Sequence, residues 1–264
     1  MKFDAAKLKN WVAGKEAYLP GLGKLFSKTK SDILIIGASV FELYEIQGWI
    51  VPFKRKTGDI DLSIGIISDD SLYAEGKEIL LSLKYKVDGH HPYRYHPPKM
   101  LPGGYTYVDL LAHPADEDTR PEVASHAMGA GPGFSFRGFH FAQEEAFRLQ
   151  KNVSFPNPFG LISLKQESYL DEPVRRSKDF ADIVELASGL VETGTHFEID
   201  KLWSKISQKP EAKRIKEMFR MILAEDTRWD LEEIRNDLRG RNFDDTFIDE
   251  TLPQRLKDFN EILE

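Results

Sequence analysis

RKTGDIDLSIG, residues 55–65, decides how the fold of this chain is interpreted, because it places two carboxylates inside an aliphatic run. Asp is disfavoured in strands, so Asp59 and Asp61 need a physical reason to stand there. Successive side chains of a strand point to opposite faces, which puts the two Asp on the same face. The opposite face is apolar and consists of Ile60, Leu62 and Ile64.

A pair of Asp in the order D-x-D fits two different structures. The Cα atoms lie roughly 6.6 Å apart at a rise of about 3.3 Å per residue, so the carboxylates can lean together. They would repel each other unless a cation lies between them, and oxygen-rich sites suit Mg²⁺ or Mn²⁺. The pattern therefore indicates either a divalent metal site or an edge strand with one solvated face.

Composition narrows the class of protein. The chain has 264 residues, no Cys and a formal net charge of −7. The length allows one large domain or two modest ones, and the absence of Cys excludes disulfides, Cys-zinc sites and thiol nucleophiles. We find no apolar signal segment and no run of about 18 apolar residues, so we expect a cytoplasmic protein without a membrane partner. The net negative charge argues against a protein that binds nucleic acid over its whole surface, but it permits a local basic patch.

The pattern of apolar residues predicts an α/β (α+β) fold in two parts, a core over about residues 20–155 and a helical region over 156–264. A helix of unplaced packing precedes the core. In the core we expect, in order, a buried strand at 33–36, a helix after Ser39, a loop or short strand at 49–57, the D-x-D strand, a helix at 69–85, a strand at 103–114, and a glycine loop with an alternating strand at 129–142.

The C-terminal part is expected to be helical throughout. DEPVRR interrupts the first helical pattern, and Ser177 is suited to cap the helix that resumes after it. The expected helices contain the segments NPFGLISLKQESYL, SKDFADIVELASGLV, KLWSKISQ, EAKRIKEMFRMILAE, DLEEIRNDLRG and LPQRLKDFNEIL.

A turn of small residues, Gly37-Ala38-Ser39, joins the first strand to the following helix. Backbone N–H groups and the helix N-terminus attract anions there, and Gly lets a phosphate approach closely. Taken alone, the same sequence favours an ordinary strand–helix turn that has a Ser cap. It is neither G-x-G-x-x-G nor a Walker A loop.

A third carboxylate, Asp109, lies in the later strand of the same part. If the strands are neighbours, Asp59, Asp61 and Asp109 gather near a turn that can hold a triphosphate. Two divalent ions about 3.5–4 Å apart could then activate the attacking oxygen and stabilise the leaving group. This is phosphoryl- or nucleotidyl-transfer chemistry.

The order G-A-S, R-x-T-x-D-I-D-L, V-D-L-L resembles the minimal nucleotidyltransferase fold of the DNA-polymerase-β-like superfamily. K-x₁₃-D-x₂-D, formed by Lys165, Asp179 and Asp182, resembles its AbiEii-like branch, which includes toxins of type IV toxin–antitoxin systems. The resemblance covers roughly residues 30–190 and implies a mixed sheet flanked by helices, followed by a helical C-terminal region. The helices beyond 190 match no pattern that we can name.

The resemblance also implies roles for individual residues. Gly37 and Ser39 would hold the β- and γ-phosphates of an NTP, and Ala38 replaces the usual second Gly of that turn. The carboxylates expected to bind Mg²⁺ (or Mn²⁺) and to carry catalysis are Asp59, Asp61 and Asp109. The nucleotide would also be contacted by Lys165, and Asp179 would lie at the rim of the site or align the acceptor.

Each candidate has an ordinary structural alternative. Arg55 suits a loop salt bridge, Thr57 a turn, and Lys165 a solvated helix position. Asp179 falls in the first turn of its helix, where a carboxylate complements the helix dipole in any case, and Asp182 is expected to be structural. The cluster His90, His91 and His96 has no standard zinc spacing.

Two functions of different classes remain. The first is Mg²⁺-dependent transfer of a nucleoside monophosphate from an NTP to a hydroxyl acceptor, which would be an RNA 3′ end, a protein or a small molecule. Such an enzyme could be the toxin of a pair with an antitoxin partner. The second is a non-catalytic nucleotide- or partner-binding module that keeps the fold. Retention of all three carboxylates favours the enzyme.

Overall fold

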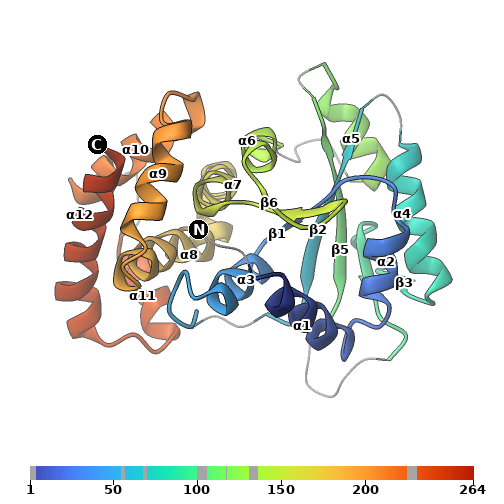
Figure 1. Cartoon of the computed structure of the whole chain (residues 1–264), viewed down its shortest axis with the longest axis horizontal. Coiled ribbons are helices and arrows are strands. Elements are labelled where there is room, and N and C mark those ends of the chain that lie inside the picture. Colours follow the sequence, from blue (N-terminus) through green and yellow to red (C-terminus); the bar gives the residue numbers. More distant parts are fainter. Residues whose placement is uncertain are drawn as a thin grey trace. The chain divides into compact units, whose positions relative to one another are not determined.

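The computed structural model describes residues 4–54, 57–67, 70–99, 106–116, 118–130, 136–224 and 231–264. They form a mixed α/β protein with a seven-stranded sheet flanked by helices and a helical C-terminal region, as the sequence predicts (Figure 1). The chain divides into two compact units. We call Asp4–Leu43 with Lys56–Asn157 the sheet unit, and Tyr44–Arg55 with Pro158–Glu264 the helical unit.

The sheet is mixed, with the order β3-β4-β5-β2-β1-β7-β6. Its strands are β1 Ile33–Ile36, β2 Ile60–Ile66, β3 Lys86–Val87, β4 Arg94–His96, β5 Val108–Pro114, β6 Phe147–Gln150 and β7 Val153–Phe155. The pairs β2–β5 and β1–β7 are parallel, whereas the other neighbours are antiparallel. The two expected strands with Asp are therefore direct neighbours at the centre of the sheet.

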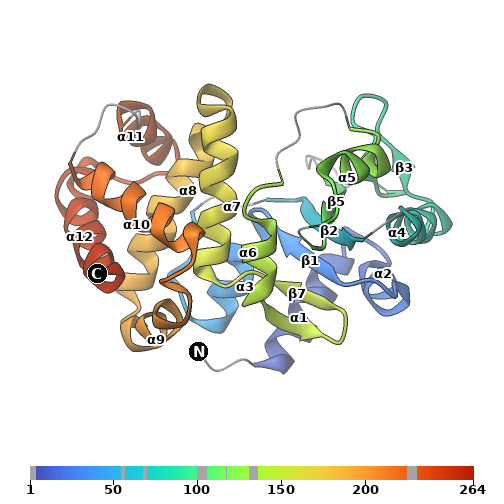
Figure 2. The ribbon, with the colours of Figure 1, turned by 90° about the horizontal axis from the view of Figure 1, so that it is seen from above.

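Helices with buried apolar residues cover this sheet. Those of the sheet unit are α1 Ala5–Glu16, α2 Leu22–Lys28, α4 Ser71–Ser82, α5 Pro121–Met128 and α6 Phe139–Glu144, together with the start of α3 Ser39–Gln47. Asp4 caps α1 by accepting from the amide of Ala6 at 2.9 Å. Helices α4 and α5 pack against β2 and β5, beside which they lie in both views (Figures 1 and 2).

The core of the sheet unit is made by aliphatic side chains on strands that are covered on both faces. In β2, Ile60, Leu62 and Ile64 have no exposed surface, as the D-x-D pattern predicts for the face opposite the carboxylates. On the other face Ser63 and Gly65 are buried and Asp61 is half-buried, so β2 is a central strand and not a solvated edge strand.

The helical unit confirms each helix expected after residue 156. Its helices are α7 Pro158–Asp171, α8 Pro173–Glu192, α9 His196–Ile206, α10 Pro210–Leu223, α11 Leu231–Gly240, a π-helical turn η1 Phe247–Thr251, and α12 Leu252–Leu263. Helix α8 begins at a Pro and is kinked at Arg176 (φ −119°, ψ 16°), immediately before the expected cap Ser177. Aromatic pairs join the bundle, with ring centroids of Phe159 and Trp203 4.9 Å apart.

Two expectations for the core are wrong. The alternating strand expected within 129–142 is in fact α6, which begins after Gly138 in the left-handed conformation (φ 82°). Phe139 and Phe141 are two residues apart, which is the spacing of one face of a strand, but both are buried on a short helix. In addition, β2 begins at Ile60, so Asp59 lies one residue before the strand.

In the described part of the chain, no helix combines the length and the apolar character that a membrane crossing requires.

Candidate active site

A row of polar side chains crosses the middle strands of the sheet. The register pairs Arg94 of β4 with Asp109 of β5, and Asp109 with Asp61 of β2. Asp61 is in turn opposite Ile36, the last residue of β1. Directly opposed residues of neighbouring strands share a face, so Arg94, Asp109 and Asp61 lie side by side. The two central Asp expected to act together are thus adjacent.

A second polar pair lies next to this row on the same face. Asp59 precedes Asp61 by two residues, and the amide of Ile60 donates to the carbonyl of Tyr107 at 3.1 Å. The carboxylate of Asp59 lies near the phenol of Tyr107. Burial raises the pKa of Tyr107, and the negative charge of Asp59 raises it further, so this phenol stays protonated.

Arg94 binds Asp109 through both carboxylate oxygens. Its Nε and Nη2 donate at 2.8 and 2.9 Å, and the centre of its guanidinium lies 3.8 Å from the centroid of the Tyr107 ring. Burial raises the pKa of Asp109, which is 7% exposed, while Arg94 opposes this shift. The hydrogen bonds to Asp109 raise the pKa of Arg94 above its already high value.

The turn after β1 closes directly over Asp61. Gly37 has a positive φ of 70°, and a Cβ built at this residue would lie 1.8 Å from Oδ2 of Asp61. Only glycine therefore satisfies both the backbone conformation and the close approach of the carboxylate. The following Ala38 is buried, so the replacement of a second glycine is accommodated here.

Ser39 begins α3 but does not cap it. Its hydroxyl donates to the main-chain carbonyl of Asp59 at 2.9 Å, and its side chain is buried. This hydrogen bond ties the start of the helix to the residue that opens the D-x-D segment. The turn, the first Asp and the second Asp are therefore held in one arrangement, while phosphate binding by Gly37 and Ser39 stays a prediction.

The donor set suits a hard divalent cation, but the present arrangement does not supply three carboxylates at once. Both oxygens of Asp109 accept from Arg94, and Asp59 lies near the phenol of Tyr107. Within the described residues, no group of three or more His, Cys, Asp or Glu could hold a metal ion. Mg²⁺ bound by Asp59, Asp61 and Asp109 together would share Asp109 with Arg94, whose positive charge opposes the cation.

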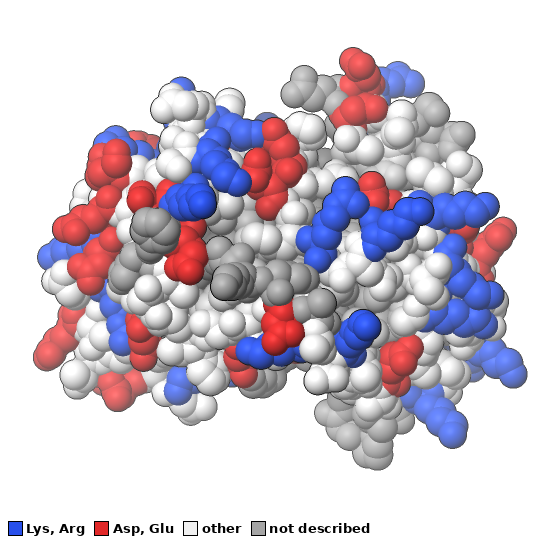
Figure 3. Space-filling view, in the orientation of Figure 1, with Lys and Arg blue, Asp and Glu red and all other residues white. Residues whose placement is uncertain are grey.

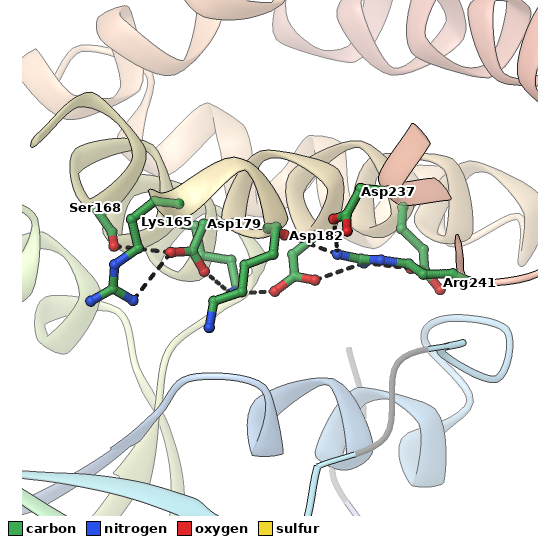
Figure 4. A network of polar contacts seen from close by, with 9 residues as sticks. Lys165, Ser168, Asp179, Asp182, Asp237 and Arg241 are labelled. Atoms are coloured by element: carbon green, nitrogen blue, oxygen red, sulfur yellow. Dashed lines mark hydrogen bonds and ion pairs between the residues drawn. The ribbon is translucent and has the colours of Figure 1, made fainter. Parts of the chain in front are cut away.

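Lys165 and Asp179 belong to the helical unit, where they form part of a buried network (Figure 4). The ammonium of Lys165 on α7 donates to Asp179 at 2.9 Å and to Asp182 at 2.5 Å, both on α8. Ser168 also donates to Asp179. The side chain of Lys165 is 7% exposed, so the alternative of a solvated helix lysine is wrong.

Arg241, after α11, extends this network. It donates to Asp182 at 2.7 Å and to Glu185 at 3.0 Å, and the second oxygen of Glu185 accepts from the amide of Lys54. Burial alone would raise the pKa of Asp179, but the neighbouring Lys165 outweighs it and lowers the value to about 2. The arrangement is that of an ion network that joins helices; the nucleotide roles of Lys165 and Asp179 stay predictions.

The histidine cluster has a local explanation. Nε2 of His96 lies 2.8 Å from the carboxylate of Asp88, which also accepts from the amides of His90 and His91. These bonds order the turn that joins β3 to β4.

Reasoning from the sequence missed Arg94, which binds a carboxylate of the candidate site directly. The segment that carries Arg94 has the sequence YRYH, residues 93–96, in which aromatic and basic residues alternate as they can in a strand. The His and Pro residues around it favour a loop. Arg55, considered as a phosphate contact, lies outside the described residues.

Positive charge also gathers away from the carboxylates. Figure 3 shows Lys and Arg over α2 and the β6–β7 turn of the sheet unit, whereas charges of both signs mix over the helical unit. A surface hollow of about 480 Å³ lies there, lined by Ser27, Lys28, Thr29, Lys30, Gln150, Lys151 and Asn152. The described lining contains no carboxylate, so it is a local basic surface on an acidic chain.

Comparisons of this chain with family models, curated proteins and solved structures gave no match.

Proposed function

We propose that this protein is a Mg²⁺-dependent nucleotidyltransferase that transfers a nucleoside monophosphate from an NTP to a hydroxyl. The observation that carries the proposal is the register of β2 and β5, which aligns Asp61 with Asp109 and leaves Asp59 on the same face. The Gly37 turn closes over this face and opens a helix, whose N-terminus favours anions. Carboxylates and an anion-binding turn are the two components that the reaction needs.

The residues of the candidate site would have separate roles in this reaction. Asp59 and Asp61 would hold divalent cations, which neutralise the phosphate chain and activate the acceptor oxygen. Gly37 and Ser39 would orient the β- and γ-phosphates through the main chain of the turn. Asp109 would accept the proton of the attacking hydroxyl or complete the metal site.

The chemistry admits an RNA 3′ end, a protein hydroxyl or a small molecule as acceptor. The basic hollow at α2 and the β6–β7 turn favours a polyanion, and RNA is the acceptor of this kind. We further propose that the enzyme is a cytoplasmic toxin with an antitoxin partner. Expression of the Asp59→Ala variant should then permit growth where the unaltered chain arrests it.

A labelling experiment tests the proposed reaction. The protein is incubated with Mg²⁺ and each of four α-³²P-labelled NTPs, with and without total RNA. We expect label in RNA or protein that is lost by several orders of magnitude in Asp61→Asn, an almost isosteric loss of one charge. Asp200→Asn on the exposed surface of α9 is the matched control and should retain activity. Incorporation that survives in Asp61→Asn would contradict the assignment.

One observation favours the second candidate, a nucleotide-binding module without catalysis. Arg94 occupies both oxygens of Asp109, which is what a site without three metal ligands would look like. Calorimetry separates the two functions. NTP binding that is equally tight with Mg²⁺ and with a chelator would support the module, whereas dependence on the metal would support the enzyme.

A further inference from the structure

We propose that Arg94 exchanges partners: it binds Asp109 in the free protein and the phosphate oxygens of the NTP once divalent metal has reached the carboxylates. The inference rests on the proposed function and identifies a substrate-binding residue that lies outside the sequence motifs described above. It also explains how the charge of Asp109 is compensated before any cation arrives.

The geometry of Arg94 suits both partners. Its Nε and Nη2 form a bidentate fork on Asp109, with donor–acceptor distances of 2.8 and 2.9 Å. The same planar fork matches two oxygens of a phosphate, which makes Arg a common ligand of both groups. Lys would provide the charge without this directionality.

The surroundings favour release of Arg94 over movement of Asp109. The side chain of Arg94 is 24% exposed and that of Asp109 is 10% exposed, so the cation has the easier path to solvent and to a ligand. Asp109 is fixed within β5, the central strand next to β2, whereas β4 has three residues. Tyr107, 3.8 Å from the guanidinium, provides an aromatic face along which the fork can turn.

Competition between cations follows from these contacts. A divalent ion on Asp109 places a second positive charge beside the guanidinium of Arg94, so the metal and the guanidinium bind this carboxylate in opposition. When the guanidinium leaves, it lies beside the carboxylate face where the triphosphate is proposed to bind. Arg94 should therefore weaken binding of metal alone and strengthen binding of the metal–nucleotide pair.

The test measures both affinities in the full-length protein. Binding of Mn²⁺ alone is followed by electron paramagnetic resonance, and binding of each of four α,β-methylene NTP analogues is followed by calorimetry in excess Mg²⁺. For Arg94→Ala we expect Mn²⁺ to bind about tenfold more tightly, because the competing charge-assisted hydrogen bonds to Asp109 are lost. We expect the analogue to bind about tenfold more weakly, because the proposed charge-assisted hydrogen bonds to its phosphate are lost. Arg120→Ala, an exposed Arg immediately before α5 in the same unit, should change neither.

Thermal unfolding in the presence of a chelator shows whether Arg94→Ala folds. Arg94→Lys keeps the charge near Asp109 and is the second variant if Arg94→Ala does not fold. It should weaken analogue binding and leave Mn²⁺ binding within about threefold, because a single ammonium replaces the fork. A fall in both affinities, or no change in either, means that the ion pair is only structural and overturns the exchange. If the unaltered protein binds no analogue, the proposed function itself fails and the exchange fails with it.

Discussion

Replacing Lys165 by Met tests whether this residue holds the helical unit together. The substitution keeps the length of the side chain but removes the cation shared by Asp179 and Asp182, which are 6% and 0% exposed. Breaking a buried ion pair by removing one partner costs about 3–5 kcal/mol, because the remaining charge is buried without compensation. Arg241 still binds Asp182, and Asp179 keeps Ser168 and a longer ion pair with Arg176 at 3.6 Å, so we expect a loss at the lower end of this range, near 3 kcal/mol.

Urea denaturation followed by circular dichroism measures this loss, with the free energy of unfolding extrapolated to water. Lys205→Met on the exposed surface of α9 is the matched control and should change stability by less than about 0.5 kcal/mol. A loss below about 1 kcal/mol for Lys165→Met would refute the structural role. Full stability together with weaker NTP binding would instead support the nucleotide contact predicted from the sequence.

Three more perturbations follow from contacts in the sheet unit. Gly37→Ala should lower the melting temperature by adding at least about 1 kcal/mol of backbone strain. It should also weaken Mn²⁺ binding, because the new Cβ displaces Asp61, and an unaltered Mn²⁺ affinity would count against the close approach of Gly37 to Asp61. Burial lowers the pKa of His113 to about 4 from an ordinary 6.5, so the stability it contributes is complete above pH 6.5 and is lost as the pH falls toward 4. Urea denaturation should show a fall of about 2 kcal/mol between pH 7.5 and 5, and a rise on acidification would contradict it. Lys15→Met should cost about 2 kcal/mol in the same assay, because the buried ammonium donates to Glu42 at 2.8 Å, and an unchanged midpoint would show that the pair is neutral.

Local pattern was sufficient to predict much of the candidate site. The alternation of the D-x-D segment places Asp59 and Asp61 on one face without any knowledge of the partner strand, because the period of a strand is two residues. In α8, Asp179 and Asp182 are three residues apart and therefore lie on one side of the helix, which brings both to Lys165.

Contacts between distant segments could not be predicted in this way. The pairing of Asp109 with Arg94 depends on β4, a strand of three residues whose register is set by β5 and not by its own composition. Arg241 reaches Asp182 from the end of a helix far along the chain, and nothing in the spacing of either residue indicates the other. In α6, the left-handed Gly138 starts a helix where alternation alone favours a strand.

The parallel register of β2 and β5 also limits how the length of the chain can change. A single residue inserted into β2 after Ile60 would rotate every later side chain to the other face, which would carry Asp61 into the space now filled by the aliphatic residues. Substitutions can alter one contact at a time, but an insertion or deletion in either strand would remove the whole polar row. Among natural or engineered variants of this protein, the lengths of β2 and β5 should therefore be less tolerant of change than most of the residues within them.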